Sequence, residues 1–397
     1  MIDLRTQGLL LNPRSPSEVS SALVEAWNKF ENEQPALFAG AIGISTSGST
    51  SGGIGSIIVL SRTALELSAR AVNRRLNALP RDVWGLVLPM FHVGGYSIPL
   101  RARLSGSNVA EFQEPWNAVS FHAWLSVEKV SLLSLVPTQL FDLVGLGLQA
   151  PSGLRAVIVG GGRLDEAVHS KARALGWPVL QSYGLTECCS QVATAMIDGD
   201  GRTLELLDHV ETRIGENEKL WIRSKSLLSA RIVFDRELKA KLEHPVDREG
   251  WFETADRAEV NRIGFSDGGR DVLKILGREG ETVKVMGELV DLVRVRSSIE
   301  TLALEKPEFA RFAQRTWVVA VPEARRENEL VLIFEVGASS EADHRESLKS
   351  LLMELRSVLA PFEIPSRWVA IEKLPRSSLG KVMSSLLTDE ARKRVTE

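Results

Sequence analysis

The chain carries Gln181-Ser182-Tyr183-Gly184-Leu185-Thr186-Glu187 directly after an apolar run. That run, Pro178–Gln181, predicts a short buried strand that ends where Tyr183-Gly184 begins. A second apolar run, Val157–Val159, predicts another buried strand, and Gly160-Gly161-Gly162 follows it at once. Ligands of parallel sheets bind beyond the carboxyl ends of the strands. The two turns therefore predict a ligand site at one edge of a parallel sheet.

Strand and helix patterns alternate through the first 277 residues. Leu86–Pro89 predicts a further buried strand, while Thr63–Leu79 and Asn117–Val127 show helical patterns. Such alternation predicts a layered α/β fold with a largely parallel sheet. We therefore expect one large α/β domain over residues 1–277.

The pattern changes near residue 277, where we place a domain boundary. Gly264–Gly269 is rich in turn residues, and Val272–Leu276 predicts a short strand. Two more strands, a helix and a last strand are predicted over Trp317–Val321, Leu330–Val336, Arg345–Leu359 and Trp368–Ile371. We expect residues 278–397 to form a smaller α+β domain.

The composition is typical of a globular protein and argues against some partners. The 397 residues are 44% hydrophobic and 25% charged, with a formal net charge of −3. No basic surplus indicates binding to nucleic acid or to an anionic membrane. The two cysteines, Cys188 and Cys189, are adjacent, which disfavours a disulfide and gives no metal-binding spacing. We expect a reducing cytoplasm, with no signal peptide at Met1–Arg5 and no transmembrane run of about 18 apolar residues.

Five short motifs follow one another along the chain. They are Ser45–Gly53, Gln181–Glu187, Gly250–Asp256, Gly277-Arg278 and Leu374–Lys381. In this order they resemble the adenylate-forming acyl/aryl-CoA ligase superfamily. The resemblance implies a large α/β adenylation domain, a smaller mobile α+β domain, and a reaction that uses ATP, Mg²⁺ and coenzyme A.

The first motif implies a phosphate-binding loop. Glycine lets backbone N–H groups converge on an anion, and Ser and Thr hydroxyls add donors. The resemblance assigns the nucleotide phosphates to Thr46, Ser47, Gly48, Ser49 and Thr50. Relatives usually carry a lysine near the end of this loop, where Ile54 stands here. The loop therefore lacks one phosphate-facing charge.

The second motif implies the adenine and metal side of the site. Tyr183 offers an aromatic face to a purine base, Thr186 a hydroxyl to a phosphate, and Glu187 a carboxylate to Mg²⁺. Ser182 and Gly184 belong to the same nucleotide-binding segment. Upstream, Gly161 is similar to a residue of the family's second turn beside adenine.

Two downstream residues resemble the family residues that bind the ribose. Asp256 matches an aspartate that accepts hydrogen bonds from both ribose hydroxyls, and one carboxylate can accept both bonds of a vicinal diol. Relatives usually have glycine where Ala255 stands. Arg278 resembles the residue that closes the same pocket against ribose or phosphate.

The last motif implies a catalytic lysine. Lys381 matches the residue that bridges the acyl carboxylate and the α-phosphate. A placed cation lowers the repulsion between two anions that must meet, and its loss typically costs ~10²–10³ in rate. In the family the smaller domain then rotates to admit coenzyme A, about a hinge that corresponds to Gly280. Gly287–Val290 loosely matches the loop that serves the thiol step.

The acyl side is implied by the resemblance of Pro89–Ser97 to the family motif that lines the acyl pocket, in which His92 matches the residue that gates or orients the carboxylate. Together with Arg101, Arg103 and the later Ser190, this motif most resembles the o-succinylbenzoate–CoA ligases of menaquinone synthesis. That acid carries an aromatic carboxylate that is not activated, so its pocket needs a cation. Arg101 and Arg103 are the candidates. Relatives carry many more residues before the phosphate loop than the 44 found here, which predicts a compact member with a shortened N-terminal subdomain.

Three functions stay open at this point. The chain is a small carboxylate–CoA ligase, an adenylating enzyme that delivers its acyl group to a carrier-protein thiol, or an inactive nucleotide-binding relative. Lys381, Glu187 and Asp256 argue against the inactive relative, while Ile54 and the short N-terminus argue for it. The sequence leaves the oligomeric state open.

Overall fold

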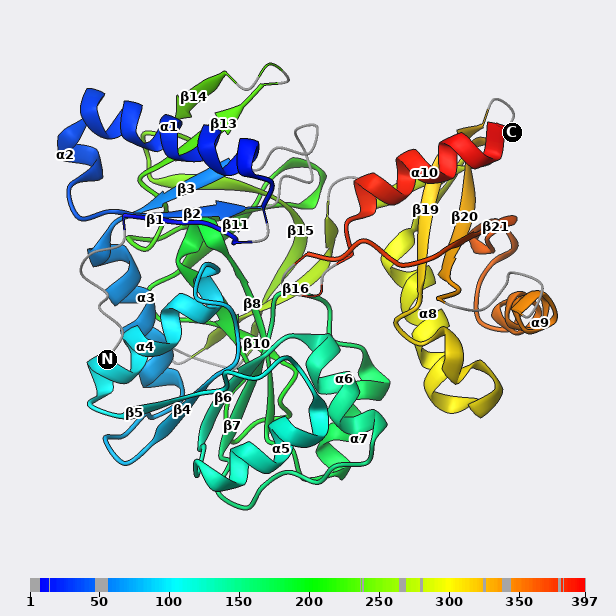
Figure 1. The fold of residues 1–397 in the computed structure, drawn as a ribbon, viewed down its shortest axis with the longest axis horizontal. Helices are drawn as coiled ribbons and strands as arrows, with labels where there is room; N and C mark the ends of the chain where they lie inside the picture. The colour runs from blue at the N-terminus through cyan, green and yellow to red at the C-terminus, as the bar shows by residue number, and fades with distance from the viewer. Residues whose placement is uncertain are drawn as a thin grey trace. The chain divides into compact units, whose positions relative to one another are not determined.

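The structure is a computed structural model in which the chain divides into two compact units, Met1–Ile275 and Leu276–Glu397 (Figure 1). It describes residues 8–13, 15–46, 56–235, 237, 239–263, 269–278, 281–323, 326–337, 344–377, 380 and 382–396. Each unit has hydrophobic clusters of its own, so each is described by itself.

The larger unit is built on a sheet of eleven strands in the order β11-β12-β15-β16-β10-β9-β8-β7-β6-β4-β5. Five strands at one end are parallel. They are β4 (Val83–Leu86), β5 (Asn108–Glu111), β6 (Leu132–Leu135), β7 (Ala156–Val159) and β8 (Val179–Leu185). Every residue of β6 and β7 is buried, as expected for parallel strands that are covered on both faces.

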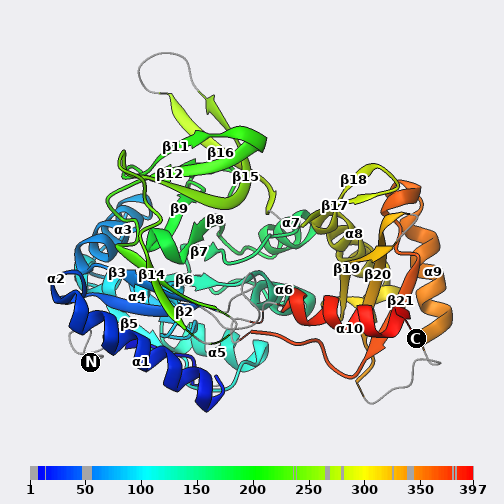
Figure 2. The same ribbon diagram turned by 90° about the horizontal axis from the view of Figure 1, so that it is seen from above.

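Helices cover both faces of this parallel region. The helices α3 (Arg62–Arg75) and α4 (Val93–Ser105) lie on one face (Figures 1 and 2). On the other face lie α5 (Ala118–Val127), α6 (Pro137–Gly145) and α7 (Glu166–Ala174). Helix starts are fixed locally, because the side chains of Ser61, Asn117 and Asp165 each accept a first-turn backbone N–H.

The remainder of the large sheet is antiparallel. The strand β9 (Ser190–Thr194) pairs with β8, and β10 (Leu204–Leu206) lies between β9 and β16 (Arg270–Arg278). Beyond β16 come β15 (Trp251–Ile263), β12 (Lys219–Arg223) and β11 (Glu211–Ile214). The expectation of a largely parallel sheet therefore holds for β4 to β8, and each described pairing from β9 to β12 is antiparallel.

A second sheet of the larger unit has the order β1-β2-β3-β13-β14. Its strands are β1 (Leu9–Leu10), β2 (Ile42–Thr46), β3 (Ser56–Leu60), β13 (Ala230–Phe234) and β14 (Ala240–Glu243). The helices α1 (Ser17–Glu33) and α2 (Pro35–Phe38) contribute Trp27, Phe30 and Phe38 to the cluster that covers it. The strands β2 and β3 pair with Thr46 opposite Ser56, and these are the described residues on either side of positions 47–55.

The smaller unit consists of a hairpin and a three-stranded sheet between helices. The hairpin is β17 (Thr282–Val285) with β18 (Glu288–Asp291), and the sheet has the order β19 (Thr316–Glu323), β20 (Glu327–Glu335), β21 (Arg367–Ile371). The helices are α8 (Leu292–Glu305), α9 (Arg345–Leu355) and α10 (Ser384–Thr396). Alternate residues of β20 face opposite sides, since Leu332 and Phe334 pack with α8 and α9 while Val331 and Ile333 pack with α10.

Sequence prediction located most of these elements and misplaced several boundaries. The helix predicted over Thr63–Leu79 is α3, which ends at Arg75, and the strand predicted over Pro178–Gln181 is β8, which continues to Leu185. The strand predicted at Leu86–Pro89 is instead β4, which ends at Leu86, and Pro89 lacks the N–H that a strand pairing needs. The helix predicted to reach Leu359 ends at Leu355. Val272–Leu276 lies inside the longer strand β16, and of the predicted turn segment only Gly269 lies within the described residues.

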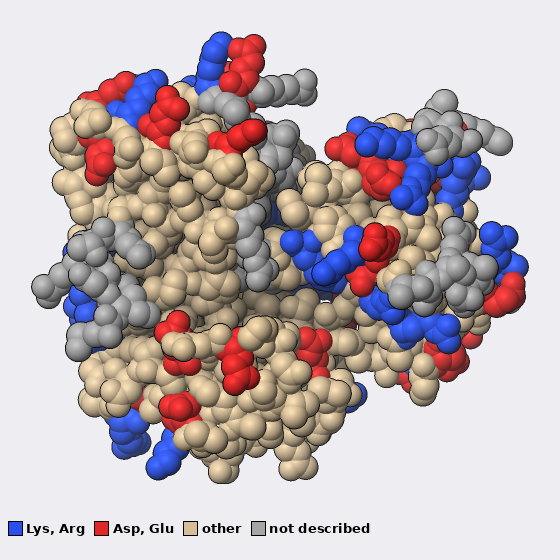
Figure 3. All heavy atoms as spheres, in the orientation of Figure 1, with Lys and Arg blue, Asp and Glu red and all other residues tan. Residues whose placement is uncertain are grey.

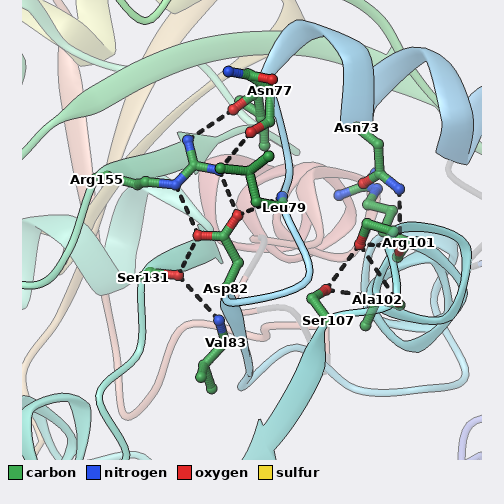
Figure 4. Close-up of polar contacts among 12 residues, drawn as sticks. Asn73, Asn77, Leu79, Asp82, Val83, Arg101, Ala102, Ser107, Ser131 and Arg155 are labelled. Atoms are coloured by element: carbon green, nitrogen blue, oxygen red, sulfur yellow. Dashed lines mark hydrogen bonds and ion pairs between the residues drawn. The ribbon is translucent and has the colours of Figure 1, made fainter.

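A buried ion pair joins the amino ends of three adjacent parallel strands. Asp82, Ser131 and Arg155 each occupy the position just before β4, β6 and β7, respectively (Figure 4). Arg155 donates to both Asp82 oxygens, Nε at 2.8 Å and Nη2 at 2.5 Å, and also to the carbonyl oxygens of Leu76 and Asn77. Asp82 further accepts the Ser131 hydroxyl and the Leu79 backbone N–H. This network fixes the edge of the sheet opposite the carboxyl ends of the strands.

On the face of the larger unit that Figure 3 shows, most atoms belong to uncharged residues. Asp and Glu lie along its upper edge and in several places across its lower part, whereas Lys and Arg show mainly near its edges. Over the part of the chain that the structure describes, none of the helices is both long enough and apolar enough to cross a membrane.

Candidate active site

The predicted nucleotide segment lies at the carboxyl end of β8. Tyr183 and Gly184 belong to this strand, and Thr186 and Glu187 to the 3₁₀ turn η1 (Thr186–Cys188) that follows. A Cβ at Gly184 would lie 1.8 Å from the Ser190 carbonyl oxygen, so no larger residue fits there. Glycine at this position lets β8 pass close to the Ser190 backbone, at an irregularity in the pairing of β8 with β9. The half-buried Tyr183, Thr186 and Glu187 side chains lie at this end of the strand.

Tyr183 and Asp256 come together although they are 73 residues apart. The Tyr183 hydroxyl donates to Asp256 Oδ2 at 2.6 Å. The backbone at Asp256 is fixed in turn, because its N–H donates to the Thr254 hydroxyl oxygen at 3.1 Å, and the Thr254 hydroxyl donates to the Leu220 carbonyl at 2.9 Å. The predicted adenine-side and ribose-side residues therefore share one region of the larger unit.

The second predicted turn lies beside β8. Gly161 follows β7 with φ of 79°, a left-handed conformation that favours glycine. A Cβ on its neighbour Gly160 would lie 3.2 Å from the Ser182 carbonyl, so the turn packs closely on β8. The Ser182 hydroxyl itself is buried. It donates to the Ala193 carbonyl oxygen and is hydrogen-bonded to the Thr194 hydroxyl. Its contacts hold β8 to β9, and its proposed contact with a nucleotide stays a prediction.

His92 lies at the amino-terminal end of α4, where its ring packs on Phe91 with the centroids 4.6 Å apart. Burial lowers the pKa of His92 to about 4, so the imidazole is neutral at pH 7. The start of α4 is set by Gly95, because a Cβ there would lie 2.2 Å from the Pro89 carbonyl oxygen. A neutral imidazole at a helix start can donate or accept a hydrogen bond without adding charge.

Arg101 and Arg103 lie in different environments. The Arg101 guanidinium from α4 is 1% exposed, donates to the Ser190 hydroxyl at 3.2 Å and lies over the Trp84 ring at 5.6 Å. Its main-chain carbonyl accepts the Asn73 amide (Figure 4). Burial lowers the pKa of Arg101 to about 9, which leaves the group protonated at neutral pH. Arg103, in contrast, is exposed and pairs with Glu66 at 2.9 Å.

Arg101 is a buried cation for which the described residues supply no counter-ion. Among the described residues, no carboxylate forms an ion pair within 4.0 Å of its guanidinium, and its Nε has no hydrogen-bond partner there. Two other buried polar atoms without a partner in the described part lie on the neighbouring strands β4 and β6, Trp84 Nε1 and Ser134 Oγ. Unpaired buried cations are costly, so an anionic ligand would stabilise this one.

The other predicted site residues are only partly placed. Thr46 ends β2, where its hydroxyl lies 2.9 Å from the Ser56 hydroxyl. The exposed Arg278 ends β16. Ser47, Gly48, Ser49, Thr50, Gly280 and Lys381 lie outside the described residues, as does Ile54. Within the described ranges, His, Cys, Asp and Glu side chains form no cluster of three or more that could hold a metal ion.

Two features of the site were missed from sequence. Thr254 is 4% exposed and fixes Asp256, yet nothing in its local pattern distinguishes it from a surface threonine. Cys188 and Cys189 directly follow Glu187 and are 0% and 1% exposed. Burial raises the pKa of both thiols, so they are unreactive core residues beside the turn.

The AMP-binding enzyme family matches residues 11–220, which is more than half of the chain. The chain therefore belongs to the AMP-binding enzyme family, and the family predicted from the five motifs is confirmed.

Curated relatives are about 25% identical to this chain over the aligned residues. The 2-succinylbenzoate–CoA ligase of Staphylococcus epidermidis is 26% identical over 336 residues, which cover 81% of this chain and 64% of the relative. The enzyme of the same name from Bacillus subtilis is 25% identical over 347 residues, which cover 80% of this chain and 63% of the relative. The chain thus spans slightly less than two thirds of the length of these relatives.

Solved structures confirm the α/β fold class. The o-succinylbenzoate coenzyme A synthetase of Bacillus subtilis, in complex with the acyl-adenylate intermediate, matches with a TM-score of 0.71 at 21% identity, over 88% of this chain and 69% of that one. The same enzyme with ATP and magnesium matches with a TM-score of 0.67 at 22% identity, over 87% and 69%. ATP-bound MatB from Rhodopseudomonas palustris matches with a TM-score of 0.69 at 21% identity, over 89% and 68%.

Proposed function

We propose that this protein is an ATP-dependent carboxylate–CoA ligase that works through an acyl-adenylate, with o-succinylbenzoate as its acid. Family membership, the ordered motifs and the names of the curated relatives support the reaction class. A chain with two buried thiols fits a reducing cytoplasm. The partners are then small molecules, namely the acid, ATP and coenzyme A.

The buried charge of Arg101, which no carboxylate among the described residues offsets, carries the choice of acid. o-Succinylbenzoate has two carboxylates, of which the succinyl group is activated and the aromatic one is not. A pocket for it must therefore bind one anion while presenting the other to the nucleotide. We assign the aromatic carboxylate to Arg101, because this guanidinium is protonated and lacks a carboxylate partner in the described part of the chain.

The reaction balances in two steps. A succinyl carboxylate oxygen attacks the α-phosphorus of ATP, the bond to the β-phosphate bridging oxygen breaks, and pyrophosphate leaves. The thiolate of coenzyme A then attacks the acyl carbonyl, and AMP leaves. We assign Lys381 to the approach of the two anions in the first step, and the neutral His92 to orienting the carboxylate.

The remaining roles concern the nucleotide. Tyr183 contacts adenine, Asp256 accepts the ribose hydroxyls, and Thr46 and Thr186 donate to phosphates. Glu187 is the carboxylate that would hold Mg²⁺, since this ion takes few protein ligands and fills its remaining positions with phosphate oxygens and water. When bound, Mg²⁺ offsets phosphate charge.

The two compact units support the assignment of different roles to the two parts of the chain, as the motifs predict. We propose that residues 1–277 bind and adenylate the acid, while residues 278–397 supply Lys381 and rotate about Gly280 between the two steps. The strand β16 spans the point at which the compact units divide, so it links the two parts directly.

A pyrophosphate-release screen tests the proposal. Purified protein with ATP and Mg²⁺ would be given o-succinylbenzoate, benzoates and fatty acids in parallel, followed by coenzyme A or an acyl carrier protein. The expected result is release that depends on o-succinylbenzoate and a thioester formed with coenzyme A. If only the other acids are turned over, the choice of o-succinylbenzoate is wrong and only the assignment as a ligase remains. If the acyl group is transferred only to the carrier protein, the carrier replaces coenzyme A as the acceptor. If no acid releases pyrophosphate, the protein is an inactive relative.

A further inference from the structure

The Arg101 guanidinium is oriented by few contacts. Its Nη2 group donates to the Ser190 hydroxyl oxygen at 3.2 Å, and the guanidinium lies over the Trp84 ring at 5.6 Å. Within the part of the chain that the structure describes, its Nε has no hydrogen-bond partner and no carboxylate pairs with it. The orientation of this buried cation therefore depends on where the backbone places the Ser190 side chain.

The backbone that carries Ser190 has an uncommon conformation. Cys189 and Ser190 have φ of 57° and 110°, both in the left-handed range that residues other than glycine rarely adopt. Such strain persists only where the surrounding structure holds it, and it is concentrated at functional sites. A serine side chain is therefore kept at a position where glycine would be less strained.

Two contacts hold this turn in place. The Ser68 hydroxyl, on α3, donates to the Cys189 carbonyl oxygen at 3.0 Å, and both residues are 1% exposed. On the other side, β8 passes so close to Ser190 that a Cβ at Gly184 would lie 1.8 Å from the Ser190 carbonyl oxygen. The bond from Ser68 joins residues 121 positions apart, so it ties the turn to a separate helix.

The same helix also holds the backbone of Arg101. Asn73, further along α3, donates its side-chain amide to the Arg101 carbonyl oxygen at 2.8 Å (Figure 4). The helix α3 packs against both α4, which carries Arg101, and β9, which begins at Ser190. The hydrogen bond between Arg101 and Ser190 thus joins two backbones that are each tied to α3.

We propose that Ser68 is a positioning residue for the acid, which acts through Ser190 and Arg101. Its hydroxyl holds the left-handed turn at Cys189, the turn places the Ser190 hydroxyl oxygen, and that oxygen orients the guanidinium toward the aromatic carboxylate. This inference rests on the proposed assignment of that carboxylate to Arg101 and deepens it. It makes the choice between acids with and without this carboxylate depend on a buried serine of α3.

Two variants, Ser68→Ala and Ser190→Gly, test the inference. Pyrophosphate release would give the KM for o-succinylbenzoate and for 4-oxo-4-phenylbutanoate, which keeps the succinyl carboxylate and lacks the aromatic one. The unaltered protein should have a KM for o-succinylbenzoate about tenfold or more below that for the analogue. In both variants the KM for o-succinylbenzoate should rise about fivefold, while those for the analogue and for ATP should change less than about twofold.

Melting temperatures separate positioning from an effect on folding. Ser68→Ala leaves the buried Cys189 carbonyl without this donor, so its melting temperature should fall. Ser190→Gly relieves the backbone at φ of 110°, so its melting temperature should fall less. Loss of the same preference in two variants of different stability would support positioning.

Further variants serve as controls. Ser224→Ala is the matched change, because the Ser224 hydroxyl also donates to the backbone carbonyl of a residue distant in sequence, His209, at 2.8 Å. It should leave the ratio of the two KM values unchanged. Adding Ser68→Ala to Arg101→Leu should cause little further change in that ratio, because both substitutions act through one guanidinium.

The outcomes distinguish this inference from the proposed function. If the unaltered protein prefers o-succinylbenzoate and either Ser68→Ala or Ser190→Gly keeps the full preference, the inference is wrong and the acid assignment stands. An equal rise of both KM values in Ser68→Ala would show that the serine serves only the fold, and a full further loss in the double variant would show that it acts elsewhere; each result overturns the inference. If the unaltered protein does not distinguish the two acids, Arg101 is not the carboxylate site and the inference fails with that assignment.

Discussion

Asp82→Ala should destabilise the larger unit by about 3 kcal/mol. The Asp82 side chain is 3% exposed and accepts four hydrogen bonds, two of them from Arg155. Removing one partner of a buried ion pair typically costs about 3–5 kcal/mol, because the other charge is left unpaired. Arg155 is 32% exposed and keeps the carbonyls of Leu76 and Asn77, so water and these acceptors lower the cost toward the smaller value.

Scanning calorimetry would measure this effect, with the transitions of the two units fitted separately. A loss of about 3 kcal/mol corresponds to a fall of roughly 6–12 °C in the melting temperature of the larger unit. Asp208→Ala is the matched control, because Asp208 also pairs with an arginine but is 55% exposed. The control should cost less than about 1 kcal/mol.

The dependence on pH gives a second check. Burial raises the pKa of Asp82, but the bonds from Arg155, Leu79 and Ser131 together outweigh it and hold the pKa below the usual value. A carboxyl group with a lowered folded-state pKa stabilises the protein above its unfolded pKa of about 3.9, and this contribution is lost as pH falls through the folded value. The difference between the unaltered protein and Asp82→Ala should hold from pH 7 to 5 and narrow below pH 4. A cost no larger than that of the control, or a difference independent of pH, would refute the reasoning.

Lys381→Ala should abolish pyrophosphate release and spare thioester formation from a supplied acyl-adenylate, whereas equal loss of both half-reactions would contradict its role. Gly280→Pro fixes φ near roughly −65°, so it should preserve pyrophosphate exchange and lower the output of acyl-CoA; unchanged steady-state ligation would exclude this hinge. Arg101→Leu should raise the KM for o-succinylbenzoate by about tenfold or more and leave that for ATP unchanged. Its effect should exceed that of Arg103→Leu, and the reverse order would reassign the pocket. Burial lowers the pKa of His92 in the folded protein to about 4, so the unfolded chain takes up a proton on His92 at a higher pH than the folded protein does. The free energy of unfolding should therefore fall as pH drops from about 6.5 to 4. Denaturation of His92→Gln across this range should show a shallower slope, by at most ~1.4 kcal/mol per pH unit; identical slopes would exclude the contribution.

Local patterns were enough to predict the parallel part of the fold. The strand β7 is a short apolar run that ends at a glycine turn, so the residues themselves indicate both the strand and its exit. The start of β8 was predicted in the same way, but the strand continues through Gly184 to Leu185. The antiparallel part was not predicted, although a signal was present. In β12 the buried Leu220 and Ile222 alternate with less buried neighbours, and β13 alternates in the same way.

Contacts between residues that are far apart in the sequence could not be predicted from local patterns. Arg101 lies 89 residues before Ser190, and its burial depends on how α4 packs on the sheet. From sequence it could not be distinguished from Arg103, because the two arginines are only two positions apart on one helix. The bond between Tyr183 and Asp256 similarly depends on sheet curvature, which no local pattern specifies.

The two buried cysteines have a practical consequence for measuring motion. Cys188 and Cys189 are the only thiols of the chain, and neither is accessible or readily ionised. Maleimide dyes should therefore leave the folded protein unlabelled without any need to remove its native thiols. A cysteine introduced on the surface of each unit would give a donor and acceptor pair against a silent background. Single-molecule energy transfer could then test whether the distance between the units changes as ATP, acid and coenzyme A are added in turn.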